Sequence, residues 1–162
     1  MDKFPMTYDL LQTVYKMENI SRYSKRATMA DIMRHELMYH EGGFYLDSSM
    51  FLFSNVFYKW LSYKLVLSTE RTFRHRWSQS MCIFGVMPKF SGLLRIISPN
   101  NTNRYNLWLK DALEIAGPNN FRWTVRGMEE YDPDYLIMEY DAFYPMTYDL
   151  PNMYDTYCLA HP

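Results

Sequence analysis

The chain has 162 residues, 48% of them hydrophobic, and a formal net charge of −1 at pH 7. A net charge so close to zero removes the global electrostatic argument for binding nucleic acid or an anionic membrane surface. Two cysteines cannot form a disulfide framework, and the composition of residues 1–10 predicts neither a signal peptide nor a membrane segment. We therefore predict a single domain over residues 1–162, with enough apolar residues for a sizeable core.

The first part of the chain has the periodicity of two helices and a strand. Apolar residues three and four positions apart predict a helix over residues 7–17, which we expect to pack under a sheet, and a longer helix over residues 23–41. Gly42 and Gly43 suit the left-handed or tight backbone that ends a helix. Residues 44–46 are aromatic and aliphatic, which predicts a strand after the glycine turn.

The rest of the chain alternates between strand and helix patterns, which indicates an α/β domain. The predicted strands cover residues 65–68, 80–87 and 135–140. The predicted helices cover residues 56–61, 90–97, 105–115 and 121–131.

Three polar residues are expected to meet near the glycine turn. Asp31 and Arg34 are three residues apart in the predicted helix, so both point from one face about a turn apart. Asp47 follows the predicted strand, and ligands of open α/β sheets gather at the carboxyl ends of strands. An acid, a base and a second acid therefore converge on one crevice.

This segment resembles the glycosyltransferases with a DXD sugar-binding region, the type that includes initiating mannosyltransferases and capsular-polysaccharide enzymes. The family pattern is a small residue, Asp, two apolar residues, Arg, a helix, Gly-Gly, aromatic or aliphatic residues, and Asp-x-Asp. The spacing is kept throughout. The matching positions here are Ala30, Asp31, Arg34, Gly42, Gly43 and Asp47.

The resemblance extends over residues 20–161 and implies a fold and an activity. The fold is GT-A-like, with a mainly parallel Rossmann-like sheet flanked by helices. Since only residues 1–19 precede the match, it also implies a domain truncated at its N-terminal half. The activity is retaining transfer of a sugar from a UDP- or GDP-sugar donor to a hydroxyl of a glycan or another acceptor. Asp31, Arg34, Gly42 and Gly43 would lie at the donor sugar.

A divalent metal ion, Mn²⁺ or Mg²⁺, is implied by the same resemblance. Asp47 would bind it, assisted by Ser49 and by His161, which resembles a histidine in the closing segment of family members. Ser49 stands where the family has the second acid of Asp-x-Asp. A neutral hydroxyl is a weaker ligand for a hard cation than a carboxylate, so we expect a lower metal affinity.

Other interpretations of these patterns stay open. A catalytically silent module that binds a nucleotide sugar or a glycan would keep the same motif. Residues 71–77, R-T-F-R-H-R-W, place aromatics between basic residues, as in some nucleic-acid-binding segments, but the neutral chain favours no nucleic-acid partner. His35 and His40 are five residues apart, not the four that a zinc-protease helix requires, and we expect both at the helix surface or near a loop.

Two further features complete the sequence-based expectations. The hexapeptide P-M-T-Y-D-L occurs at residues 5–10 and again at residues 145–150, and two copies so far apart do not make a solenoid. The expected location is cytoplasmic, or the Golgi if the chain is a fragment of a membrane-anchored relative.

Overall fold

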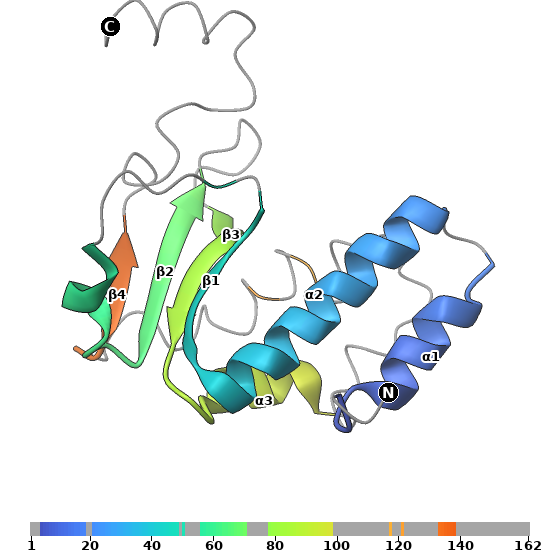
Figure 1. Cartoon of the computed structure of the whole chain (residues 1–162), viewed down its shortest axis with the longest axis horizontal. Coiled ribbons are helices and arrows are strands. Elements are labelled where there is room, and N and C mark those ends of the chain that lie inside the picture. Colours follow the sequence, from blue (N-terminus) through green and yellow to red (C-terminus); the bar gives the residue numbers. More distant parts are fainter. Residues whose placement is uncertain are drawn as a thin grey trace, which may run out of the picture.

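The computed structural model describes residues 4–18, 21–48, 50, 56–70, 78–98, 117, 121 and 133–138. These residues form a mixed α/β structure in which helices lie beside an open sheet (Figure 1). The helices are α1 (Tyr8–Lys16), α2 (Arg22–Glu41), α3 (Ser91–Ile97) and the 3₁₀ helix η1 (Val56–Trp60), and the strands are β1 (Gly43–Leu46), β2 (Leu65–Glu70), β3 (Ser78–Val86) and β4 (Tyr135–Met138).

The sequence patterns located each of these elements to within about two residues at most ends, as expected for assignments from periodicity. The predicted strand at residues 135–140 is observed over Tyr135–Met138. The predicted helix at residues 105–115 lies outside the described residues, and so does the one at residues 121–131 except for Phe121.

The described strands are ordered β1-β3-β2-β4. Strand β3 pairs antiparallel with both β1 and β2, and β2 pairs parallel with β4. The expectation of a mainly parallel sheet is therefore wrong for the described strands. The reason lies in the connection from β2 to β3, which comprises residues 71–77, whereas a parallel pair needs a crossover of a dozen or more residues.

Helix α2 is the longest described element, with 20 residues and a length of about 30 Å. Ser21 begins it as an N-cap, because its hydroxyl accepts a hydrogen bond from the backbone N–H of Ser24 at 3.0 Å. Gly42 ends it with φ of 68°, and its N–H donates to the Met38 carbonyl at 2.9 Å. The chain then reverses and β1 runs back beside α2 (Figure 1).

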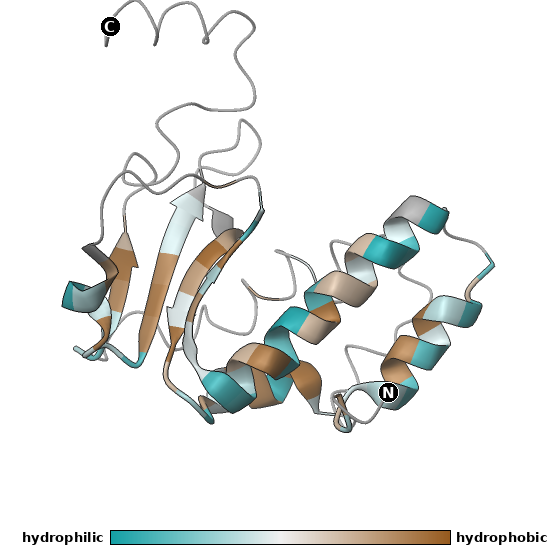
Figure 2. Cartoon of the chain, viewed as in Figure 1, coloured by the Kyte–Doolittle hydropathy of each residue, from teal (hydrophilic) through white to brown (hydrophobic). Residues whose placement is uncertain are grey.

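The main core lies between the sheet and the helices α2 and α3. Figure 2 shows apolar residues along the strands and on α3 where these elements face one another. In a strand, alternate side chains point to one face, which places Leu65 and Leu67 together on the face of β2 that meets this core. The buried members of this cluster are Met38, Leu65, Leu67, Met81, Phe84, Val86, Phe90, Leu93, Ile96 and Phe121.

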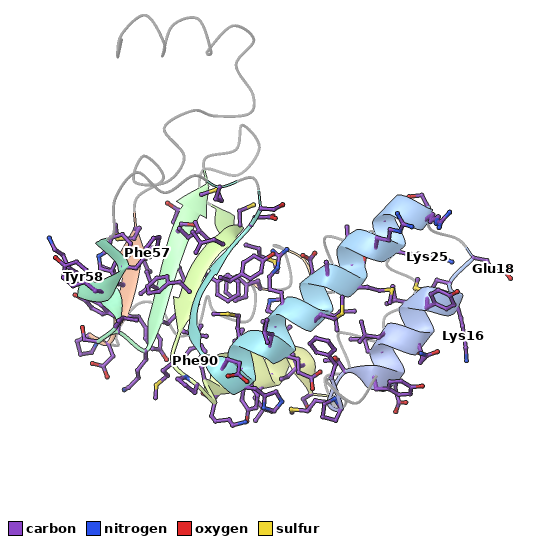
Figure 3. All side chains as sticks on the ribbon, viewed as in Figure 1. Lys16, Glu18, Lys25, Phe57, Tyr58 and Phe90 are labelled. Atoms are coloured by element: carbon purple, nitrogen blue, oxygen red, sulfur yellow. The ribbon has the colours of Figure 1, made fainter. Side chains whose placement is uncertain are left out.

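Helix α1 packs against α2 and not under the sheet, which corrects the expectation for residues 7–17. Its buried side chains Leu10, Leu11 and Val14 form a second cluster with Ile32 of α2. Spacing of three and four residues puts this apolar stripe on one face of α1, and α2 covers it. At the far end of the pair, Lys25 donates to the Tyr15 carbonyl at 3.1 Å, and Figure 3 shows Lys25 near Lys16 there.

The glycine turn yields a first prediction. A Cβ at Gly42 would lie 2.6 Å from Cδ and 2.7 Å from N of Pro88, whereas nothing lies within 4 Å of a Cβ at Gly43. Both residues have positive φ, at 68° and 87°. Gly42→Ala should therefore lower the free energy of unfolding by about 2–4 kcal/mol, and Gly43→Ala by about 1 kcal/mol, from backbone strain alone. Urea denaturation measures both, and equal losses would contradict a clash with Pro88.

Candidate functional site

The candidate site lies where α2 passes the end of β1. Asp31 and Arg34 are on one face of α2, and the N–H of Asp47 extends the β1 ladder by donating to the Cys82 carbonyl of β3 at 2.8 Å. The glycine turn brings the strand back alongside the helix, which is why residues separated in sequence meet here. The three residues that the sequence placed in one crevice are close enough that the charge of Asp47 acts on Asp31.

Arg34 is held on three sides. Its Nη2 lies 3.2 Å from Oδ1 of Asp31, and its Nη1 donates to the backbone carbonyl of Met81 at 2.7 Å. Its Cζ lies 4.2 Å from the centroid of the Tyr45 ring, which is the geometry of a cation–π contact. The side chain is only 9% exposed. The guanidinium plane is therefore set in one orientation between α2, β1 and β3.

One nitrogen of this guanidinium, Nε, makes no hydrogen bond to the described residues. Nε of Arg34 is buried and has no hydrogen-bond partner among the residues that the structure describes. A buried N–H without a partner costs about 1–3 kcal/mol, so such groups are kept where another group can accept from them. Two nitrogens of Arg34, Nη1 and Nη2, are therefore bonded within the protein. The third, Nε, has no partner among the described residues.

Burial changes the proton affinity of two groups beside Arg34. The pKa of Asp31 is raised to about 6, because burial disfavours the charged carboxylate more than Arg34 favours it, and the charge of Asp47 adds to the effect. Burial also raises the pKa of Tyr45, again against the influence of Arg34. The site therefore has a carboxylic acid that titrates just below neutral pH.

Asp47 is half-buried and its carboxylate is oriented by the turn that follows β1. Its Oδ1 accepts a hydrogen bond from the N–H of Ser48 at 2.9 Å, and its carbonyl accepts from Met50 at 2.9 Å. These bonds turn the chain sharply after the strand and hold the carboxylate at the strand end. The bond from the Met50 N–H to the Asp47 carbonyl has the i to i+3 pattern of a β-turn.

The other residues predicted for the site are placed differently. Gly42 and Gly43 lie at the start of β1, while Asp47 follows its end, and Gly42 is packed against Pro88. Their assignment to the donor sugar stays a prediction. Ser49, His161 and the basic residues 71–77 lie outside the described residues.

The described residues form no complete metal site. Among them, no three or more His, Cys, Asp or Glu side chains come together as metal ligands. Asp47 offers the oxygen ligand that Mn²⁺ and Mg²⁺ prefer. It fits the role of one ligand, and a complete metal site would need ligands from beyond the described residues, of which Ser49 and His161 are the predicted ones.

Two groups at the site were not identified from the sequence. Tyr45 is two residues before Asp47 in an extended segment, so the alternation of strand side chains places both on one face and could have indicated it. The Met81 carbonyl carries no sequence signal, because any residue has one. Only the pairing of β3 with β1 brings it to Arg34.

The histidines of α2 differ from expectation in one case. His35 is fully buried, and its ring centroid lies 5.6 Å from that of Phe121 and 6.3 Å from that of Phe84, so its expected place at the helix surface is wrong. The spacing Ile32, His35 places it on a buried face of the helix. His40 is partly exposed, as expected, with Nδ1 2.7 Å from Nζ of Lys89 and Nε2 3.7 Å from Glu36.

Comparison with protein-family models, with curated proteins and with solved structures finds no match for this chain. None of the helices in the described ranges combines the length and the apolar character that crossing a membrane requires. The motif and the geometry of the Arg34 site are therefore the features that indicate a function for this chain.

The raised pKa of Asp31 yields a second prediction. Between about pH 4 and pH 6 the folded protein binds more protons at this carboxyl than the unfolded chain does, so its contribution to stability falls as pH rises. The free energy of unfolding of the wild type, relative to Asp31→Asn, should decrease by about 2–3 kcal/mol over this range. Urea denaturation at a series of pH values measures the difference, with Asp9→Asn as an exposed-acid control. A difference that grows with pH would contradict the burial argument.

Proposed function

We propose that this chain is a retaining glycosyltransferase that transfers a sugar from a UDP- or GDP-sugar donor to an acceptor hydroxyl in glycan synthesis. The observation that carries the proposal is the fixed Arg34 guanidinium, bound to Asp31 and Met81 and stacked on Tyr45, beside Asp47 at a strand end. This geometry supports the proposal, because it holds the arginine and the acids of the motif close together.

Asp31 and Arg34 would hold the hydroxyls of the donor sugar. A carboxylate accepts from two hydroxyls and a guanidinium donates in a fixed fork, so the pair fixes the orientation of a polyol ring. The remaining donor at Nε of Arg34 is suited to such a hydroxyl. Fixing the anomeric carbon relative to the attacking hydroxyl supplies a large part of the rate enhancement of a transfer reaction.

Asp47 would face the diphosphate of the donor. A divalent cation bound there, with Ser49 and His161 as further ligands, would neutralise the negative charge of the departing diphosphate. Asp47 supplies a directed carboxylate whose Oδ1 is tied to the Ser48 N–H.

A GT-A-like fold is part of the proposal. Its support is the mixed α/β architecture of the described residues and the position of Asp47 directly after β1. The antiparallel pairs of β3 would then form the part of the sheet that carries the motif.

A silent module that binds a nucleotide sugar or glycan is the second candidate. Ser49 favours it, because the second acid of the motif is replaced by a hydroxyl, while the sugar-facing residues Asp31 and Arg34 are kept. Binding would then persist without turnover.

The direct test measures hydrolysis of a panel of UDP- and GDP-sugars by the purified chain, with and without Mn²⁺. We expect one donor to be hydrolysed in the presence of Mn²⁺, and Asp47→Asn to reduce the rate at least about a hundredfold by removing the charge that holds the cation. Asn keeps an acceptor for the Ser48 N–H, so the turn remains. Asp9→Asn, at an exposed helix position, is the matched control. Donor binding without turnover would indicate the silent module.

Arg34→Lys tests the sugar-binding geometry separately. A lysine keeps the charge but cannot bond Asp31 and Met81 in a planar fork while stacking on Tyr45. We expect donor affinity to fall about tenfold or more, measured by isothermal titration calorimetry. Arg95→Lys on α3 is the control for the same exchange at an exposed position. An unchanged affinity would exclude Arg34 from the donor site.

A further inference from the structure

The first copy of the repeated hexapeptide is bound by a buried carboxylate. Glu36 of α2 is fully buried, and its two oxygens accept hydrogen bonds from the N–H of Met6 at 2.8 Å and the N–H of Thr7 at 3.0 Å. The hydroxyl of Thr7 donates to the same carboxylate. Thr7 is the N-cap of α1, where a negative charge is favourable. All three donors belong to the hexapeptide.

An apolar contact completes the recognition of this copy. Leu10, the last residue of the hexapeptide, is 1% exposed and packs in the cluster with Ile32. Ile32 and Glu36 are four residues apart on α2, so they form one strip on the helix. This strip, which we call the hexapeptide surface, therefore binds the residues that the second copy repeats.

The second copy has the residues for the contacts to Glu36 and Ile32. It lacks the backbone N–H for the hydrogen bond that follows them in the first copy. Residues 145–150 offer identical donors at Met146 and Thr147 and an identical leucine at Leu150. The next residue is Pro151, where the first copy has Leu11, whose N–H donates to the Thr7 carbonyl at 2.8 Å. Proline has no N–H to donate. We therefore expect the second copy to bind the same surface more weakly than the first.

The position of β4 bears on whether a second copy at this surface belongs to the same chain or to a neighbouring one. Strand β4 is at the opposite edge of the described sheet from β1, and β1 is the strand that contacts α2 (Figure 1). Three strand spacings of about 4.8 Å and the width of a helix, about 10 Å, separate β4 from the far side of α2. The seven Cα–Cα steps from Met138 to residue 145 span at most about 25 Å when fully extended, which leaves no length to spare. The second copy of a neighbouring molecule is not limited by this length of chain.

We propose that residues 145–150 of one chain bind the hexapeptide surface of a second copy of this chain, in place of that copy's own residues 5–10. The exchange joins two chains through the contacts to Glu36 and Ile32 that the first copy makes within one chain. Because the chain's own copy is tethered beside the surface and continues into α1, it prevails at low protein concentration. Since the second copy repeats the residues of the first, the exchange needs no new interface chemistry.

The test weakens the first copy and leaves the second intact. Thr7→Val in the full chain removes the hydroxyl donor to Glu36 and keeps the side-chain shape, so the chain's own copy should bind about tenfold less well. Sedimentation equilibrium should then show self-association at about tenfold lower protein concentration than in the wild type. Adding Thr147→Val should reverse this change. Thr13→Val, whose hydroxyl bonds the Asp9 carbonyl away from the surface, is the matched control.

Other outcomes overturn the proposal. Equal association of the single and double variants would show that residues 145–150 do not compete for the surface. The free energies of unfolding of the Thr7→Val and Thr147→Val variants are a further check. If they are non-additive and this non-additivity is independent of protein concentration, the exchange occurs within one chain. If Thr7→Val fails to fold, a labelled peptide of residues 144–151 is titrated into the wild-type chain instead. Binding that Thr147→Val in the peptide does not weaken would also overturn the proposal.

Discussion

Helix α2 has to satisfy three sets of partners at once, and this constraint organises the rest of the described structure. Asp31 and Arg34 meet β1 and β3, and His35 and Met38, each one turn further along α2, lie against the main core. Ile32 and Glu36 meet the segment that begins α1. Residues four apart lie on the same side of a helix, so the site residues and the core residues share one side of α2 at successive turns.

Two acids of α2 illustrate how partners decide the effect of burial. Glu36 is fully buried and receives N–H donors from the start of α1, which compensate for the loss of water. Asp31 has one close cation, Arg34, but also feels the charge of Asp47, and burial raises its pKa to about 6. The same side-chain chemistry therefore serves to attach a helix in one case and to create a titrating group in the other. The second arrangement is the one expected at a functional site.

The Arg34 site also shows why a polar motif needs a scaffold. Asp31 alone would leave the guanidinium free to rotate about several bonds. The carbonyl of Met81 and the ring of Tyr45 remove that freedom, and both come from strands that other contacts hold. Tyr45 in turn stacks on Phe84 with ring centroids 5.7 Å apart, which connects the site to the main core. Changes in the core should therefore affect the orientation of Arg34.

The sequence by itself determined the elements and the local turn. Helix α2, the reversal at Gly42 and the strand before Asp47 follow from periodicity and from the backbone freedom of glycine, which act over a few residues. The tertiary structure alone decided the pairing of β3 with β1, the packing of α1 on α2, the burial of His35 and the Met81 contact to Arg34. These depend on which apolar faces meet across the chain, and a periodic pattern shows that a face is apolar without showing what covers it.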